Sequence, residues 1–222
     1  PQVSEQIRNS FSGALNVGTT SILVEKYMYW YRYDERGRMT EKKIPGAEVV
    51  YMLYDLRDRL VATQDGNLRN EDPYKWLVTK YDALDRPVMT ALWESTKTRS
   101  QLVVDLNDPD LCQLYEEYLG PGSSGYFYDY TNESFPVFGN LSTFTVLTVN
   151  VYDRYYNIPS AFQFDESFST GYDALKDPIG LPTRTYSKIL HADGTITNDL
   201  NTVSYYDRKG RCLSYTQDTS YY

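Results

Sequence analysis

Apolar and polar residues alternate over much of the chain, and this period of two is typical of β-strands. The first such segment spans residues 22–33, where tyrosines stand at every second position from Tyr27 to Tyr33. Bulky residues also occupy positions between them, so we expect both faces of this strand to be covered near its middle. Further strands are predicted over residues 142–153, 183–190 and 195–207.

One segment, residues 107–120, has the spacing of a helix instead. Asn107 or Asp108 would cap this helix, and Pro109 suits its first turn. The apolar stripe and the terminating glycine are Leu111, Leu114, Tyr115, Tyr118 and Gly120. The glycine-rich residues 120–125 then predict a loop. We therefore expect one short helix inside an otherwise β-rich chain.

A short motif, Tyr-Asp-x-x-Gly/Asp-Arg, recurs along the sequence. Its four full copies begin at Tyr33-Asp34, Tyr54-Asp55, Tyr81-Asp82 and Tyr206-Asp207. Tyr152-Asp153 is an incomplete copy because Tyr156 stands where the glycine belongs, and Tyr172-Asp173 begins a copy with one extra residue. The spacing between copies is irregular, so this is a repeat with insertions.

The motif has the residues of a β-hairpin turn. Its Asp, at the first position of a type I turn, can accept a hydrogen bond from the backbone two residues on. The residue before the arginine, which we call the hinge residue, then needs a positive φ as the return strand begins. Glycine adopts a positive φ freely, and Asp is among the few other residues that tolerate it. The hinge residues are Gly37, Asp58, Asp85 and Gly210, and Arg38 follows the first of them. The repeated aspartates are therefore interpreted as turn residues rather than catalytic acids.

These patterns divide the chain into four segments. We expect a lead-in over residues 1–21, motif hairpins over 22–106, a helix and loop insertion over 107–141, and a second β segment over 142–222. The two β segments are expected to form one continuous array. The chain opens on Pro1 and closes on Tyr221-Tyr222, and we interpret it as a piece of a longer polypeptide.

Composition narrows the classes of partner. The chain has 222 residues, 41% of them hydrophobic, which is enough for a sizeable core. Its net charge of −8 and its lack of a long basic stretch argue against a nucleic acid or an anionic membrane as partner. No run of about 18 apolar residues predicts a membrane span, and no signal peptide is visible. Cys112 and Cys212 have no metal-site spacing; a disulfide stays open, but two buried free thiols are the favoured interpretation.

The motif copies resemble the YD repeats of the RHS repeat family, and the flow of the sequence resembles the large RHS proteins of Bacteroidetes-type bacteria. The resemblance covers residues 22–94 and 183–215. It implies a long β-sheet that spirals into a shell, which encloses a C-terminal effector in toxin systems, and related repeats that serve in cell-surface adhesion. It also implies a bacterial protein that is secreted or lies at the cell surface. Effector and self-cleavage functions of such proteins lie in a downstream core region and tail, and no such core motif is present here.

Catalytic groups are sparse. His191 is the only histidine and precedes a turn, and no nucleophile elbow accompanies it. Cys112 falls in the expected helix, where a packing role is favoured. Carboxylates that could serve a glycosidase by type are Glu116-Glu117, Asp165-Glu166 and the group Asp105, Asp108 and Asp110. Neither the residues near Asp108 nor Asp65 to Asn67 follow a calcium loop. We therefore expect no enzyme, no metal and no cofactor.

Aromatic residues offer the alternative function. Trp30, Trp76 and Trp93, together with the many tyrosines, could form a platform on which sugar rings stack. The favoured interpretation is that these rings fill an interface of the sheet. The sequons at Asn132 and Asn140 would be unused in a bacterial protein.

The sequence therefore predicts a mainly β protein, with antiparallel YD-type hairpins in an extended curved sheet and one short helix in an insertion. The function expected is that of a non-catalytic structural segment, which builds a scaffold or shell around another part of the same polypeptide or a carried effector domain. A carbohydrate-binding or adhesive module, with a surface glycan or protein as partner, is the alternative, and a glycoside hydrolase-like enzyme is the third. An exposed sheet edge would also favour self-association edge to edge.

Overall fold

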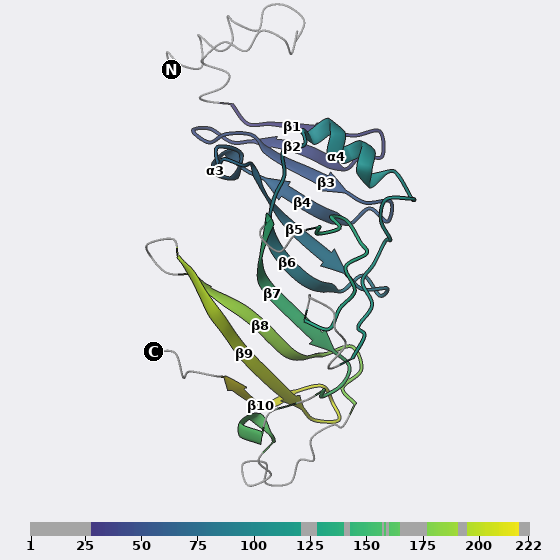
Figure 1. The fold of residues 1–222 in the computed structure, drawn as a ribbon, viewed down its shortest axis with the longest axis vertical. Helices are drawn as coiled ribbons and strands as arrows, with labels where there is room; N and C mark the ends of the chain where they lie inside the picture. The colour runs from purple at the N-terminus through teal and green to yellow at the C-terminus, as the bar shows by residue number, and fades with distance from the viewer. Residues whose placement is uncertain are drawn as a thin grey trace, which may run out of the picture.

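The computed structural model describes residues 28–120, 128–139, 143–156, 158, 160–164, 177–190 and 195–217. Within these residues it forms one open sheet of ten strands, whose spatial order is the order of the sequence (Figure 1). The strands are β1 (Trp30–Tyr33), β2 (Met39–Lys43), β3 (Val50–Tyr54), β4 (Leu60–Gln64), β5 (Lys75–Tyr81), β6 (Pro87–Glu94), β7 (Phe144–Tyr152), β8 (Pro182–Leu190), β9 (Ile196–Tyr206) and β10 (Cys212–Gln217). The helical elements are α3 (Gly66–Arg69), α4 (Arg99–Leu106) and the 3₁₀ turn η2 (Ser160–Phe162).

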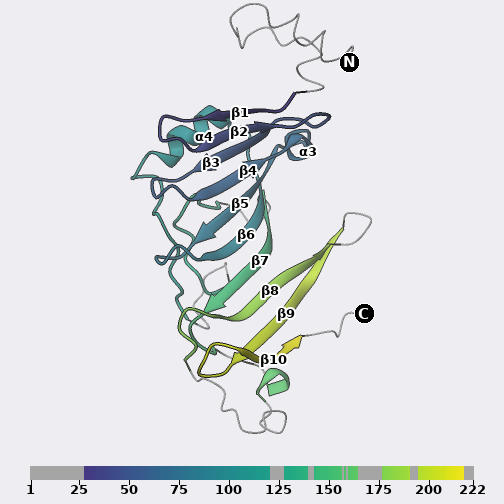
Figure 2. The ribbon, with the colours of Figure 1, turned by 180° about the vertical axis from the view of Figure 1, so that it is seen from behind.

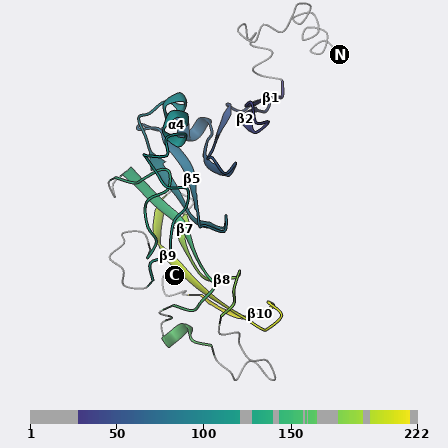
Figure 3. The ribbon, with the colours of Figure 1, turned by 90° about the vertical axis from the view of Figure 1, so that its right-hand side faces the viewer.

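Every neighbouring pair of strands is antiparallel, so the sheet is a simple meander. The connections β1–β2, β3–β4, β5–β6, β7–β8 and β9–β10 therefore follow one another along the same side of the sheet, on the right in Figure 1. The strand direction turns steadily from β1 to β10, which is the ordinary twist of a sheet (Figure 3). The predicted fold class, a mainly β chain of antiparallel hairpins, is confirmed.

The core lies on one face of this sheet. Alternation along β5 buries Trp76, Val78 and Lys80 and leaves Leu77 37% exposed on the other face. Against the buried face pack residues of α4 and of the segment after it, namely Leu102, Leu106, Tyr130, Phe135 and Phe138. In Figure 2, the view from behind, α4 accordingly lies beyond the strands.

The helix predicted over residues 107–120 is wrong. The helix of this region, α4, ends where the predicted one should begin. A capping box starts it, in which Thr98 and Gln101 bond each other's backbone N–H groups. The chain after Asn107 is irregular and extended, with isolated bridges between Gln113 and Ser134 and between Tyr118 and Tyr130. The supposed apolar stripe does not form one core face, because Leu111 and Leu114 are 53% and 37% exposed, whereas Tyr118 packs against the core.

The first strand also differs from expectation. β1 has a neighbour on one side only within the described sheet, and Tyr31 and Tyr33 are 44% and 58% exposed. The prediction that both faces of this strand are covered is therefore wrong for its described part. Residues 1–27, which include the predicted lead-in and the start of this strand, lie outside the described residues. The strands predicted over 142–153, 183–190 and 195–207 are confirmed as β7, β8 and β9.

Among the described residues, no helix has both the length and the apolar character that a membrane crossing requires.

Candidate functional site

The repeated turn of the first hairpin is a closed network. Asp34 N–H donates to the Arg38 carbonyl at 3.0 Å, and Gly37 N–H donates to the Asp34 carbonyl at 3.0 Å. One carboxylate oxygen of Asp34 accepts from the N–H groups of Arg36 and Arg38, at 3.0 and 2.9 Å. The other accepts from Arg38 Nε at 2.7 Å. The Asp34 side chain is therefore committed to holding the turn.

The other three full copies repeat this geometry. In each, the carboxylate accepts two backbone N–H groups and the Nε of the arginine that closes the motif; the pairs are Asp55 with Arg59, Asp82 with Arg86, and Asp207 with Arg211. The repeat predicts a positive φ at the hinge, and the four hinge residues Gly37, Asp58, Asp85 and Gly210 have φ values of +77°, +63°, +63° and +75°.

The arginine of each turn also reaches the next hairpin. Arg38 donates from Nη1 to Asp58 at 2.9 Å and to the Asp55 carbonyl at 3.0 Å, and its guanidinium lies 5.2 Å from the centre of the Tyr54 ring. We call the contact between two successive hairpins a joint. It brings the residue that follows one hinge, which we call the joint residue, to the turn of the following hairpin. A planar, always charged guanidinium suits this double role of ion pair and ring contact.

Two further joints continue the series. Arg59 bonds Asp85 at 2.9 Å and lies 4.8 Å from the centre of the Tyr81 ring. Arg86 donates from both terminal nitrogens to the Asp153 carboxylate, at 2.8 and 2.9 Å, and its guanidinium lies 4.3 Å from the centre of the Tyr152 ring. The three joints thus link four successive hairpins through the same chemistry.

The motif tyrosines tie the same hairpins together from the other direction. Tyr81 donates its hydroxyl to the carbonyl of Leu60 at 2.8 Å, and Tyr152 donates to that of Pro87 at 3.0 Å. In both cases the accepting residue directly follows the arginine that lies over the ring. Tyr81 and Tyr152 therefore each contact the preceding hairpin through both the ring face and the hydroxyl.

The incomplete copy at Tyr152 is completed by distant residues. Asp153 N–H donates to the Leu181 carbonyl at 3.1 Å, as Asp34 N–H does to Arg38, and the N–H of Gly180 donates to the Asp153 carboxylate at 2.7 Å. The absence of a nearby glycine therefore reflects an insertion, because Gly180 (φ +86°) is the hinge and Leu181 takes the place of the arginine.

The last joint accordingly lacks charge on both sides. Leu181 stands where the other turns have arginine, and the hinge of the next hairpin is Gly210. A side-chain carbon added at Gly210 would lie 3.6 Å from Leu181 Cδ1. Arginine thus meets an acid at three joints, and leucine meets glycine at the fourth.

These contacts lower the pKa of Asp153 and of Asp34. Hydrogen bonds from Arg86 hold the pKa of Asp153 below its ordinary value despite partial burial, and the same carboxylate raises the pKa of Arg86. For Asp34, desolvation acts to raise the pKa, but hydrogen bonds and charge from Arg38 outweigh it and the pKa is lowered. Asp153 and Asp34 are therefore held in their ionised form at neutral pH, which is unsuited to a general acid.

A second polar cluster is fully buried. Lys80 and Glu116 are 2% and 1% exposed, with Lys80 Nζ 2.6 Å from Glu116 Oε1. Lys80 Nζ also donates to Asn132 Oδ1 and to the Ser134 carbonyl, at 3.1 and 2.9 Å, which accounts for three ammonium hydrogens. The carboxylate further accepts from the Ser134 N–H and hydroxyl, the Thr131 hydroxyl and the N–H of Glu133.

This cluster keeps Glu116 ionised. Burial alone would raise the pKa of Glu116. The charge of Lys80 and hydrogen bonds from Lys80, Ser134 and Thr131 outweigh this effect, so the pKa is lowered. Burial in turn lowers the pKa of Lys80. Glu116 was considered together with Glu117 as a candidate acid pair by type. The structure instead uses Glu116 to fasten the segment after α4 to strand β5.

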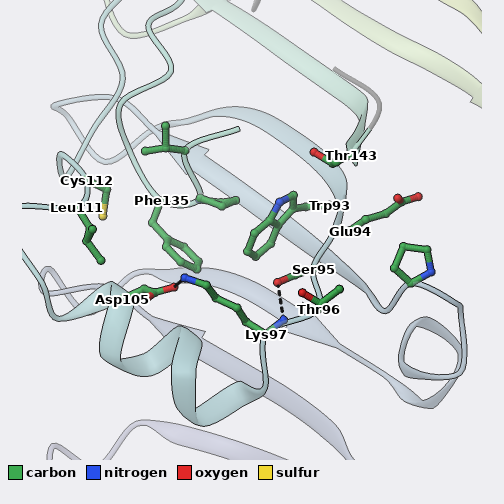
Figure 4. Close-up of a pocket in the computed structure, with 13 residues that line it drawn as sticks. Trp93, Glu94, Ser95, Thr96, Lys97, Asp105, Leu111, Cys112, Phe135 and Thr143 are labelled. Atoms are coloured by element: carbon green, nitrogen blue, oxygen red, sulfur yellow. Dashed lines mark hydrogen bonds and ion pairs between the residues drawn. The ribbon is translucent and has the colours of Figure 1, made fainter. Parts of the chain in front are cut away.

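The tryptophans do not form an exposed row, although Trp76 and Trp93 lie opposite each other in β5 and β6. Trp76 is 1% exposed, Trp30 lies on the edge strand β1, and Trp93 lines a pocket of about 500 Å³ beside α4 (Figure 4). In that pocket Trp93 meets the edge of Phe135, with ring centres 5.8 Å apart. Lys97 pairs with Asp105 at its rim, at 2.6 Å, so Asp105 is also engaged.

The remaining candidates are scattered. Cys112 and Cys212 are not joined by a disulfide; the first is half-buried and the second is exposed, so the expectation of two buried thiols is wrong for Cys212. Burial raises the pKa of the Cys112 thiol, which disfavours a nucleophilic role. Asn132, the first sequon residue, is engaged by Lys80 and the backbone of Phe138. Four of the sites discussed from the sequence lie outside the described residues: His191, Asp165-Glu166, Tyr172-Asp173 and Asn140. The described part of the chain has no group of three or more His, Cys, Asp or Glu side chains placed to bind a metal ion.

Comparison with known proteins adds little to this geometry. No protein-family model matches the chain, and no curated protein matches it in sequence. One similar solved structure is a chain of the crystal structure of TcdB2-TccC3-TEV, with a TM-score of 0.28 and 12% sequence identity. The match covers 99% of this chain and 10% of that one, so the chain spans about a tenth of the length of its structural neighbour. A likeness this weak carries no argument about function, and the defined class remains an open antiparallel β-sheet.

The partners of the joints and the Lys80–Glu116 pair were not predicted from the sequence. One signal for the joints was available: glycine is the freer choice at a hinge, yet Asp58 and Asp85 occupy two of them. Asp is less favourable than Gly at a positive φ, so its presence at a hinge indicates that the carboxylate makes a stabilising contact. For the buried pair, the corresponding sign was the position of Lys80, which alternation along β5 places on the same face as Trp76 and Val78.

Proposed function

We propose that this chain is a non-catalytic structural segment of a longer protein of RHS/YD-repeat type, which builds a β scaffold or shell that encloses or presents another domain. The observation that carries the proposal is the joint. Three successive Arg–Asp joints link hairpins whose strands lie side by side in sequence order. A unit that binds its successor in the same way each time builds an extended sheet rather than a closed domain.

The use of the acidic residues supports a role without catalysis. The aspartates of the four full motif copies each accept three hydrogen bonds inside their own turn. Glu116 is saturated by Lys80 and its neighbours. Acids committed in this way serve architecture, because a general acid must be able to exchange its proton with a substrate.

The partners proposed follow from the two ends of the sheet. Within the described residues, β1 pairs with β2 only and β10 pairs with β9 only. Unpaired backbone groups on an edge favour addition of another strand. We propose that other parts of the same polypeptide cover these edges, that a carried effector domain lies behind the sheet, and that the protein is secreted or displayed at a bacterial cell surface.

Electron cryo-microscopy of the longest natural polypeptide that contains this chain tests the proposal. We expect β1 and β10 each to bond a flanking strand of the same polypeptide, with further turns of the same motif along one side. Edges that face solvent in that protein, or a flanking domain that does not extend the sheet, would overturn it.

The pocket beside Trp93 supports a second candidate, a carbohydrate-binding module. Trp93 and Phe135 line it together with polar side chains, and a sugar ring can stack on an aromatic face and bond polar groups at its edge (Figure 4). A glycan array probed with the chain and with Trp93→Ala tests this candidate. Specific binding that the substitution abolishes would favour it, and the absence of binding by the unaltered chain would end it.

A further inference from the structure

The four joints differ in chemistry. In each joint, the residue that the following hairpin supplies matches the charge of the joint residue. Where the joint residue is arginine, as at Arg38, Arg59 and Arg86, the next hairpin supplies a carboxylate. Where it is Leu181, the next hairpin supplies Gly210, which has neither a charge nor a side chain.

A mismatch at a joint has a physical cost in each direction. Leucine beside an aspartate would partly desolvate a charge without pairing it, and arginine beside glycine would lose its ion pair. The acceptor comes from the hinge itself at Asp58 and Asp85, whose positive φ of +63° aims the carboxylate at the preceding turn. Asp153, with φ +75°, does the same one turn later from the motif's aspartate position.

At the β10 edge of the sheet, the joint residue is an arginine, Arg211. Arg211 Nε donates to Asp207 at 2.7 Å, as in the other arginine turns, and Arg211 Nη2 lies 2.6 Å from the same carboxylate oxygen. Its side chain is 58% exposed, whereas those of Arg38, Arg59 and Arg86 are 22%, 9% and 21% exposed. A following hairpin would cover the part of the Arg211 side chain that is exposed here and buried in the other three arginines.

We propose that the joint residue selects the next hairpin, so that the β10 edge binds a β-hairpin with a Tyr-Asp-x-x-Asp turn in preference to one with glycine at its hinge. The statement rests on the proposed extension of the sheet and names the partner that this extension requires. A second copy of this chain is not that partner, because the hairpin at its β1 edge carries Gly37 at the hinge.

The test uses the full chain with one additional hairpin fused to its end through a flexible Gly/Ser linker. The added hairpin repeats residues 50–64, which contain the Tyr54-Asp55 turn and the hinge Asp58. Matched versions carry Asp58→Gly or Asp58→Asn in the added hairpin alone. Glycine relaxes the hinge, so a weaker contact with Gly cannot come from a strained turn. Asn keeps the shape and the tolerance of positive φ but removes the charge.

Hydrogen–deuterium exchange of the β10 amides, resolved by mass spectrometry, reports docking of the added hairpin. We expect the Asp version to slow exchange in β10, by about fivefold or more relative to the Gly and Asn versions, as a charge-assisted contact should. Repeating the series with Arg211→Leu in the parent chain should reverse the order, so that the Gly version protects β10 best, as Leu181 and Gly210 do.

The possible results distinguish failure of the selection rule from failure of the proposed extension of the sheet. Equal protection by all versions would overturn the selection rule and leave the extension of the sheet standing. A preference for Asp that persists with Arg211→Leu would also overturn the rule, since it would not depend on the joint residue. If no version protects β10, the edge does not accept hairpins of this type and the proposed function fails with it.

Discussion

At the scale of single residues, the hinge and the aspartate of each motif stabilise the turn in different ways. The hinge sets a backbone conformation that side chains resist, and the aspartate satisfies the N–H groups that this turn leaves open. Asp58 and Asp85 have a second role, because their carboxylates also accept a hydrogen bond from the arginine of the preceding hairpin. Substitutions at these positions should therefore fail for different reasons.

Gly37→Val should destabilise the fold. Nothing lies within 4 Å of an added side-chain carbon at Gly37, so the cost comes from φ, which is +77°. A β-branched residue there should lower the free energy of unfolding by about 1–3 kcal/mol. Asp34→Asn should have a smaller effect, because Asn can accept the same two backbone hydrogen bonds and loses only the partly exposed ion pair with Arg38 Nε. Urea denaturation of both variants checks this, and an Asp34→Asn variant that abolished an activity while keeping the fold would restore a chemical role for Asp34.

Stability should fall in acid. The pKa of Asp153 is lowered in the folded chain, chiefly by hydrogen bonds from Arg86. A depressed folded-state pKa contributes stability above the ordinary aspartate value near 3.8 and loses it as the pH falls through the folded value. The free energy of unfolding should thus decrease below about pH 5. Asp153→Asn should be less stable than the parent at neutral pH and lose less on acidification; an unchanged pH dependence in this variant would contradict the assignment.

At the scale of elements, the segment after α4 is fastened to the sheet by the Lys80–Glu116 pair. A buried pair holds its partners strongly once formed, because either charge left alone has no water to solvate it. Lys80 belongs to β5, and the remaining donors to Glu116 come from Thr131, Glu133 and Ser134. The pair therefore fixes where an irregular segment lies, which packing of apolar residues would do less specifically.

Lys80→Met and Glu116→Gln should each cost about 3–5 kcal/mol of stability. The double variant should cost clearly less than the sum, because no buried charge then lacks a partner. Denaturant unfolding of the four proteins measures this coupling. Fully additive costs would show that the two side chains act independently and would contradict the structure.

The sequence predicted what is decided locally. The motif fixes its turn within a few residues, so the positions of the hinges and of β7, β8 and β9 followed from pattern alone. The end of α4 did not, because the stripe after Asn107 has helical spacing but faces solvent at Leu111. The joints and the Lys80–Glu116 pair join residues far apart in the chain, and periodicity holds no information about such partners.

At the scale of the whole molecule, the described sheet is open, with β1 and β10 each paired on one side only, and it should associate with itself weakly. A head-to-tail contact would bring Arg211 of one copy to Gly37 of the next, which offers no carboxylate. Gly37→Asp should therefore strengthen the association, since Asp tolerates this backbone at Asp58 and Asp85. Gly37→Asn is the neutral control. Sedimentation velocity over a wide concentration range checks this, and strictly monomeric behaviour of the parent and of Gly37→Asp would count against edge pairing.

The central claim is that ion pairs at the turns join neighbouring hairpins, and the joint between Arg86 and Asp153 tests it best. These residues are 67 positions apart and belong to different hairpins, and Asn can replace Asp153 without straining its positive φ. The measurement is a double-mutant cycle on the free energy of unfolding with Arg86→Met and Asp153→Asn.

The account predicts a coupling of about 1–2 kcal/mol, less than for a fully buried pair because Arg86 and Asp153 are 21% and 34% exposed. Losses that add to within about 0.3 kcal/mol would contradict it, because the two side chains would then stabilise the sheet independently of their contact.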